Sequence, residues 1–273
     1  MEKSLSKKLR LVLFLLIFIV LAILSFFSSS SPNLEKESLQ SFNRDWNVTI
    51  NQNDSAIIDL PTLLDANEND QIVISQVLPS DFSTRQTLLV RGSLQNIQVK
   101  LNGSIIYDKD FSSNLASTYA SMYHFIPIPE NSNGQLIEII MISPYDNMSG
   151  TVNEIFYGSP SLIHDHLMAN HGYKFYVAIS MLIISIVFIT AYILFFKNQQ
   201  IYSLYIGFFG IFTSLWLVAE SKILQLYINN DFLIGSLAYV SIAAAPIAAV
   251  AFLKQSIFNK DKYLYSSLCI LYT

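Results

Sequence analysis

The chain has 273 residues, of which 52% are hydrophobic and only 13% charged, and its mean hydropathy is +0.42. A soluble domain usually carries about 25% charged residues, so these values argue against a single ordinary soluble domain, a disordered chain or a collagen-like fibre. The net charge of −4 argues against a broad nucleic-acid-binding surface. The single cysteine, Cys269, excludes an intrachain disulfide and a multi-cysteine zinc site.

The first apolar segment is the uncharged run 11–27, which comes after Lys3, Lys7, Lys8 and Arg10. Its length is at the short end of what spans a bilayer, about 17–25 residues. The basic residues before it predict that 1–10 lie in the cytoplasm and that the next segment lies outside. The run is either a retained signal anchor or a cleaved signal peptide, and both interpretations export the chain after residue 27.

Residues 28–174 differ from the rest of the chain in charge. They hold seven basic and sixteen acidic residues, a net charge of −9 against +5 for the remainder. The segment is long enough to bury a core of its own. Because an exported domain without disulfides is more typical of a bacterial envelope than of a eukaryotic ectodomain, we expect a bacterial extracytoplasmic domain here.

Short alternating or β-branched runs predict strands throughout this domain. The strongest signal is Asn102-Gly103 between the runs 97–101 and 104–107, because an Asn-Gly pair supplies the positive φ angles of a type I′ hairpin. A proline-containing run at 125–129 predicts an edge strand. The spacing of these segments predicts an all-β sandwich or jelly roll. The other predicted strands are 46–50, 56–60, 71–77, 87–91, 122–128, 136–142 and 152–157.

The remaining segment, 175–273, predicts a multi-span helical bundle. Uncharged runs at 175–196, 202–218 and 232–253 are each long enough to cross a bilayer. The N-terminus and the loops after 196 and 253 hold eight basic residues against Lys222 alone in the loop 218–232, which predicts that this loop lies outside.

Two further features of this segment lead to expectations. The run from 263 onward is too short for a complete span, so we expect the chain to be the truncated N-terminal part of a longer membrane protein. Ser241, Ala245 and Ala249 form a small-residue ladder beside Pro246, a pattern that suits close helix packing and a kink.

Several local motifs are similar to those of one receptor family. They are Trp46, Asp59-Leu60-Pro61, Val77-Leu78-Pro79, Thr87-Leu88-Leu89-Val90-Arg91, the hairpin 99–107, Phe125-Ile126-Pro127-Ile128-Pro129, Ser143-Pro144-Tyr145 and the stretch 214–221. Together with the exported sandwich before a multi-span bundle, they resemble the bacterial seven-transmembrane receptors with diverse intracellular signalling modules. The resemblance covers most of residues 42–273.

The resemblance implies a galactose-binding-like sandwich outside the cell, a seven-helix bundle whose first span is 175–196, and a cytoplasmic output module. In Gram-positive relatives of this kind the output often resembles a GGDEF-type diguanylate cyclase, and histidine kinases also occur. No GGDEF residues stand in this chain. The chain itself is therefore expected to carry no catalytic residue and no cofactor, and whether the whole protein is an enzyme stays open.

A ligand site is expected at the loops of one end of the sandwich, where aromatic side chains contact sugar faces and Arg or Asn side chains contact hydroxyls and carboxylates. Packing in the core or at an edge is the alternative role for the aromatic residues. By residue type the candidates are Trp46, Arg44, Arg85, Tyr123, His124 and Tyr145. The expected partners are the lipid bilayer, an extracytoplasmic ligand with carbohydrate among the options, and a second copy of the chain, with no nucleic acid.

Two more groups of residues lie close to the predicted membrane. His164, His166 and His171 could complete a zinc or copper site if His-x-His lies on a strand, because both rings would then share one face. The alternative is a polar linker that holds three of the four histidines. Glu220 and Lys222 stand at the outer face of the bundle, where they either contact the sandwich as a coupling interface or snorkel to the membrane interface.

The leading functional hypothesis is a membrane-bound signal receptor in the bacterial cell membrane, whose sandwich senses a ligand and whose bundle relays the signal. The alternatives are the input region of a sensor histidine kinase and a membrane-anchored carbohydrate-binding or structural envelope protein. A transporter component is disfavoured because the predicted spans hold no ionisable residue at mid-depth.

Overall fold

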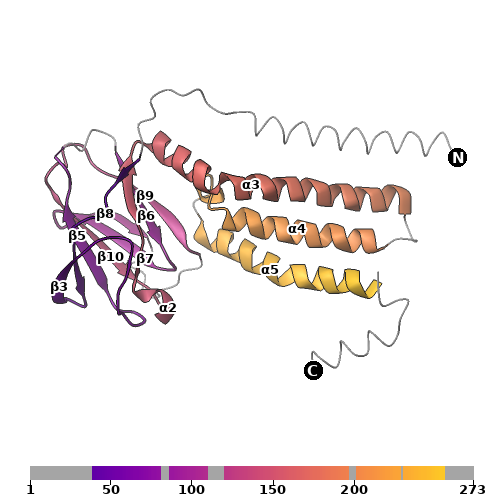
Figure 1. Ribbon diagram of the computed structural model, residues 1–273, viewed down its shortest axis with the longest axis horizontal. Coiled ribbons are helices and arrows are strands. Elements are labelled where there is room, and N and C mark those ends of the chain that lie inside the picture. The colour runs from indigo at the N-terminus through magenta and orange to yellow at the C-terminus, as the bar shows by residue number, and fades with distance from the viewer. Residues whose placement is uncertain (1–38, 81–85, 110–119, 197–200, 229, 256–273) are drawn as a thin grey trace. The chain divides into compact units, whose positions relative to one another are not determined.

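The computed structural model describes residues 39–80, 86–109, 120–196, 201–228 and 230–255 (Figure 1). The chain divides into two compact units. One, here called the β unit, consists of Glu35–Asn170 and Leu224–Gly235. The other, the helical unit, contains His171–Ile223 and the chain from Ser236 onward. The predicted membrane segment 11–27 and the predicted incomplete span from 263 lie outside the described residues.

The β unit is built from short strands and one short helix, α2, at Asp146–Ser149. Most of the predicted strands are present within a residue or two of their expected bounds. The strands are β1 Gln40–Ser41, β2 Trp46–Ile50, β3 Asn53–Ile58, β4 Thr62–Leu63, β5 Ile72–Val77, β6 Thr87–Gly92, β7 Asn96–Leu101, β8 Ser104–Lys109, β9 Met122–Pro127, β10 Leu136–Ile142, β11 Thr151–Val152 and β12 Ile155–Gly158.

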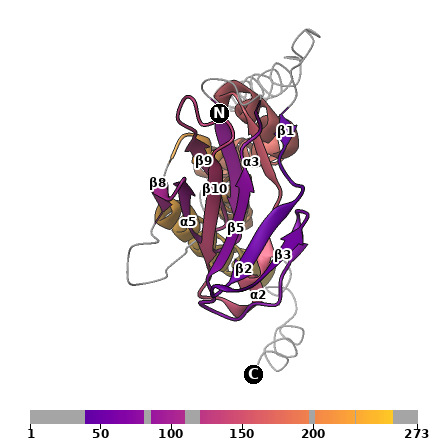
Figure 2. The ribbon, with the colours of Figure 1, turned by 90° about the vertical axis from the view of Figure 1, so that its left-hand side faces the viewer.

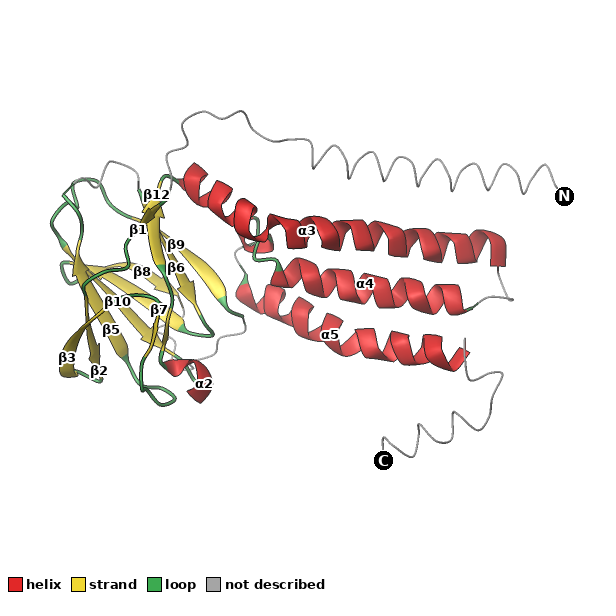
Figure 3. Ribbon diagram, viewed as in Figure 1, coloured by secondary structure: helices red, strands yellow, loops and turns green. Residues whose placement is uncertain are grey.

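The strands form antiparallel sheets, which confirms the antiparallel β-rich region predicted from the sequence (Figure 3). One sheet has six strands in the order β3-β2-β5-β10-β7-β8, and its members β5, β2 and β3 lie side by side in Figure 2. A second sheet has four strands in the order β1-β12-β6-β9, and β11 pairs with β4. Among the described strands, β9 pairs only with β6 and is therefore an edge strand.

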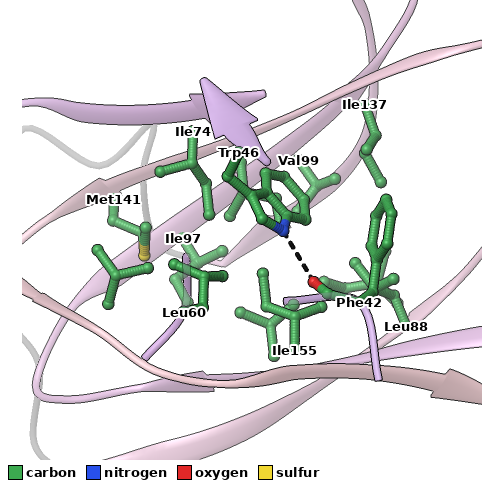
Figure 4. Packing of buried hydrophobic residues seen from close by; sticks show 14 of the residues in the cluster. Phe42, Trp46, Leu60, Ile74, Leu88, Ile97, Val99, Ile137, Met141 and Ile155 are labelled. Carbon is green, nitrogen blue, oxygen red and sulfur yellow. Dashed lines mark hydrogen bonds between the residues drawn. The ribbon is translucent and has the colours of Figure 1, made fainter. Parts of the chain in front are cut away.

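The inner faces of the two larger sheets share one hydrophobic core, so the β unit is a two-layer sandwich. Side chains on alternate positions of a strand face the same side, and Ile72 and Ile74 of β5 lie with Ile137 and Ile139 of β10 in this core. The four-stranded sheet contributes residues such as Leu88, Val90, Ile126 and Ile155. Figure 4 shows part of this cluster around Trp46.

The predicted hairpin is present with its register intact. Asn102 and Gly103 have φ angles of +46° and +78°, as a type I′ turn requires. They join β7 to β8, and Leu101 pairs with Ser104 across the turn. No neighbouring atom lies within 4 Å of where a Cβ on Gly103 would stand, so the glycine is favoured there by its backbone conformation and not by crowding.

The chain between 152 and 174 differs from the prediction in two ways. The expected strand 152–157 is divided into β11 and β12, which belong to different sheets. The expected polar linker and its His-x-His strand are helical, because α3, Pro160–Ala191, begins immediately after the sandwich. Pro160 suits the first helical position, where its fixed φ fits and its missing N–H has no helical partner to lose.

Within the described residues, three helices after the sandwich are long and apolar enough to cross a membrane: Pro160–Leu194, Tyr202–Glu220 and Asp231–Leu253. They correspond to α3 with the π-helical turn Tyr192–Phe196, to α4 and to α5, and they contain the three predicted apolar runs. The described part of the chain is thus an antiparallel β unit with three apolar helices, as the sequence predicted at this level.

Small residues lie at the buried positions of these helices. In α4 the buried side includes Ser203, Gly207, Gly210 and Ser214. A Cβ on Gly210 would lie 2.0 Å from Ser185 Oγ of α3, so α3 and α4 approach each other closely there. In α5 the predicted ladder is buried at Ser241 and Ala245 and partly buried at Ala249. Pro246 lies inside this helix.

Candidate functional site

The outer face of the four-stranded sheet is covered rather than open. Thr87 of β6 pairs with Pro127 of β9, and Leu89 pairs with Phe125. Because side chains alternate along a strand, these four residues face away from the sandwich core that holds Leu88 and Ile126. Leu89 is nevertheless only 1% exposed, so its side chain is covered on this face.

The first turns of α3 provide part of that cover. Ile163 and Leu167, one helical turn apart, are fully buried although they precede the apolar stretch of the helix. The His166 ring lies 5.0 Å from the ring of Phe156 on the same outer face of β12. Only Ser159 separates β12 from α3, so the helix starts against the sheet without an intervening loop.

The segment between α4 and α5 provides the rest of the cover and closes the free edge of β9. It contains the short helix η2, Leu224–Leu226. The backbone N–H of Tyr123 donates to Gln225 Oε1 over 2.8 Å. Further on, Asp231 forms an ion pair with Lys109 at the end of β8, with 3.3 Å between Lys109 Nζ and Asp231 Oδ1. All these residues belong to the β unit.

A cavity of about 460 Å³ lies between β9, the first turns of α3 and the segment that contains η2. Its walls carry four aromatic rings, those of Tyr107, Tyr123, Phe125 and Tyr227. Other apolar residues from β9, α3 and η2 complete the walls, and the polar lining residues are Thr87, His164 and Gln225. None of the described lining residues is Asp, Glu, Lys or Arg. The cavity is therefore apolar and aromatic, with a few hydrogen-bonding groups, as ligand pockets commonly are.

Gln225 is the polar group of this cavity that lacks a partner. Its side chain is 7% exposed, and its Nε2 has no hydrogen-bond partner among the described residues. The amide cannot be turned around to correct this, because the Tyr123 N–H needs an acceptor and finds it in Oε1. A buried N–H donor without a partner is energetically costly, so this amide is poised to bind an acceptor.

His124 forms a second buried polar contact beside the cavity. It faces inward from β9, and its Nδ1 lies 3.0 Å from the Tyr107 hydroxyl of β8. Burial, together with the nearby positive charge of Lys109, lowers the pKa of His124 to about 4, although the charge of Asp231 opposes the shift. The imidazole is therefore neutral at physiological pH, and the contact joins the two sheets as a hydrogen bond between neutral groups.

Of the residues predicted to bind a ligand, Tyr123 is the one that lines the cavity. Its ring lines the cavity, and Arg91 Cζ lies 5.9 Å from the ring centroid. Burial raises the pKa of the Tyr123 phenol, while the positive charge of Arg91 opposes that shift. The phenol is thus neutral, and the cavity gains no charge from it.

The other predicted ligand residues are not brought to this cavity. Trp46 is fully buried, and its Nε1–H donates to the Phe42 carbonyl over 2.8 Å (Figure 4), so we assign it to the core. Arg44 and Tyr145 are exposed and do not line the cavity. Arg85 lies outside the described residues.

The three histidines considered as candidate metal ligands lie on a helix and not on a strand. Two residues apart on an α-helix are about 200° apart around its axis, so His164 and His166 do not share a face as they would on a strand. His164 lies beside Asp165, with 3.6 Å between Nδ1 and Oδ1, while His166 contacts Phe156. Across the described ranges, no three His, Cys, Asp or Glu side chains are placed to hold a metal ion together, His171 included.

The predicted coupling residues come just before the segment between α4 and α5 along the chain. Glu220 and Lys222 pair with each other, with 3.4 Å between Lys222 Nζ and Glu220 Oε2. Within the β unit, Gln225 and Asp231 contact β9 and β8. Sequence reasoning missed these two because neither belongs to a periodic pattern or a motif.

No protein-family model and no curated protein matches this chain. The functional interpretation therefore depends on the geometry of the cavity and of the segments around it.

Proposed function

We propose that this chain is the sensory and membrane-spanning part of a bacterial receptor. In this proposal the β unit is an exported, jelly-roll sandwich of the galactose-binding-like type that responds to an extracytoplasmic ligand. The helices relay the response to a cytoplasmic output module, which the resemblance suggests is a GGDEF-type diguanylate cyclase. The observation that carries the proposal is the position of Leu224–Gly235, the link between two candidate spans, inside the β unit.

This position supports a relay for a physical reason. A ligand shifts a conformational equilibrium only if it binds the two states with different affinity. Any ligand that changes the spacing of β8, β9 and α3 would also change the contacts made by Gln225 and Asp231. Because α5 begins at Asp231, such a change acts directly on the start of that helix.

The ion pair between Lys109 and Asp231 offers a test that needs no ligand. In a Cys269→Ser background, a fluorophore is placed at Asn198→Cys, in the link between the first two spans, and the full chain is studied in lipid nanodiscs. Lys109→Glu sets two negative charges side by side. It is expected to displace the segment Leu224–Gly235 and thereby change the emission of the label at residue 198. The charge swap Lys109→Glu with Asp231→Lys is expected to restore it.

The matched control is Lys100→Glu on β7, which changes charge on the same sheet and should leave the emission unchanged. If Lys109→Glu alters hydrogen exchange only within Leu224–Gly235 and not the label, the sandwich is merely anchored, as in the envelope-protein alternative. The output is tested separately by incubating the full-length gene product with GTP, where formation of cyclic di-GMP supports the GGDEF assignment and its absence rejects it.

A further inference from the structure

We infer that the cavity beneath α3 and η2 binds a small, uncharged, largely aromatic ligand that carries a carbonyl-type oxygen. This inference rests on the proposed receptor function, because it names the ligand class of that sensor. The walls, the charge balance and the unpartnered amide of Gln225 each restrict the chemistry of the ligand.

The walls favour a flat apolar body. Tyr107, Tyr123, Phe125 and Tyr227 present four rings to a space of about 460 Å³, and aromatic pairs gain from offset or edge-to-face contact beyond the area that they bury. The volume is within the range of pockets for small organic molecules, about 300–1,000 Å³. An extended polymer or a metal ion does not fit these walls.

The lack of charged side chains in the described lining disfavours an ionic ligand. Acidic, lysine and arginine side chains are missing from the described lining, and Tyr123 remains neutral. Lys109 of β8 and Asp231 of α5 pair with each other. Burial of a carboxylate or ammonium without a partner is strongly unfavourable, so a charged analogue should be rejected.

The amide of Gln225 sets the polar end of the ligand. Its oxygen is used by the Tyr123 N–H, and its buried Nε2–H donors have no described partner. A ketone, ester or amide oxygen would satisfy one donor, whereas a group that can only donate would leave it unsatisfied. The required complement is an acceptor at one edge of an aromatic body.

Three compounds of similar shape separate these requirements: benzophenone, diphenylmethane, which lacks the carbonyl oxygen, and diphenylacetate, which adds a charge. Binding to the full chain in nanodiscs is measured by calorimetry against empty nanodiscs. We expect benzophenone to bind about 5–10-fold more tightly than diphenylmethane, as one net hydrogen bond provides, and diphenylacetate to show no binding. Equal affinities, or no binding of benzophenone, would overturn the inference.

Variants locate the binding. Gln225→Met keeps the side-chain length but removes the amide, and it is expected to abolish the preference for benzophenone over diphenylmethane. Because loss of the Tyr123 contact could also disturb the fold, Tyr227→Ala provides a second variant at a side chain that is 72% exposed. It should weaken benzophenone binding at least about fivefold, whereas Tyr145→Ala, an exposed tyrosine outside the cavity, should not.

Photolabelling gives an independent position. On irradiation the benzophenone carbonyl carbon bonds to a nearby C–H carbon, and the displaced hydrogen moves to the carbonyl oxygen. We expect the label on cavity residues such as Met122 or Leu226, and labelling confined to residues outside the cavity would overturn the inference. Failure of these binding tests leaves the Lys109→Glu relay experiment unaffected, so the two proposals can fail separately.

Discussion

At the scale of single residues, Trp46 shows how one side chain fixes the interior of the sandwich. Its indole is fully enclosed, its N–H is satisfied by the Phe42 carbonyl, and the Phe42 ring meets it edge to face at 4.9 Å. A tryptophan at this position therefore contributes packing, hydrogen bonding and ring contact together. The sequence could identify Trp46 as important, but its role in packing required the neighbours that only the fold supplies.

Truncation of this side chain should destabilise the β unit by about 3–5 kcal/mol, the usual cost of a large aromatic-to-alanine cavity. Trp46→Ala is expected to lower amide protection in β2, β5 and β10, measured by hydrogen exchange of the full chain in nanodiscs. Ile57→Thr, at a side chain that is 75% exposed on β3, should change stability by less than about 0.5 kcal/mol. Similar protection in both variants would contradict the core assignment.

His124 makes the stability of the β unit depend on pH. Its pKa is about 4 in the folded protein against an ordinary value of 6.5, so between these values the unfolded chain binds a proton that the folded chain excludes. The stabilisation is fully present above pH 6.5 and decreases as the pH falls toward 4. The total loss is about 3 kcal/mol.

This dependence can be measured from hydrogen-exchange protection of β8 and β9 between pH 4 and pH 7, corrected for intrinsic exchange rates. His124→Gln should flatten the curve in that window. The exposed His164→Gln, at a side chain 47% exposed, should retain it. A curve that stays steep in His124→Gln would assign the effect to other groups.

At the scale of elements, the hairpin of β7 and β8 is the part in which local sequence and final structure agree most closely. Gly103 has a φ of +78° and open space around its missing Cβ. A left-handed conformation costs a residue with a Cβ about 1–2 kcal/mol, while asparagine tolerates it better. The turn could be predicted because its determinants are adjacent in the chain.

Gly103→Ala should therefore destabilise the hairpin by about 1 kcal/mol, seen as faster exchange in β7 and β8. Gly103→Asn should cost less than the alanine variant, because its side chain is compatible with positive φ. If alanine and asparagine are equally disruptive, the cause is steric and not conformational.

The contact between α3 and α4 depends on small residues. Besides the close approach of Gly210 to Ser185, a Cβ on Gly207 would lie 2.5 Å from Ile189 Cγ1. Close backbone approach through glycine is a common way to hold helices together in a membrane. The ladder of α5 could be recognised in the sequence and that of α4 was missed, since glycines add little to a hydrophobicity pattern.

Gly210→Val should separate the two helices and lower the thermal stability of the helical unit in detergent. Phe208→Val introduces the same residue on the exposed side of α4 and should have a much smaller effect. The comparison is read from melting followed by circular dichroism at helix wavelengths. Equal melting temperatures for the two variants would show that α3 and α4 are not held together by this contact.

At the scale of the whole molecule, the distribution of basic residues predicts which parts face each side of the membrane. The β unit and residues 197–200, which join α3 to α4, should lie on opposite sides of the membrane. In a Cys269→Ser background, Ile57→Cys should react with a membrane-impermeant maleimide in intact cells, because the side chain is exposed. Asn198→Cys should react only after the membrane is permeabilised. The reverse pattern would contradict the proposed export of the β unit.

The sequence by itself determined the features whose causes are local. These are the strand segments, the Asn-Gly turn and the three apolar helices. The alternation of apolar residues, the backbone preference of a turn and the length of an apolar run all depend on residues that are neighbours in the chain. The start of α3 at Pro160 was missed because no strong period marks those turns.

Only the tertiary structure decided the candidate site. Tyr123 and Gln225 are 102 positions apart, and neither belongs to a motif that would pair them. Their contact exists because β9 is left as the edge of a sheet and the link between α4 and α5 lies against it. An unpartnered donor such as Gln225 Nε2 is defined by its surroundings in space, so no reading of adjacent residues could have identified it.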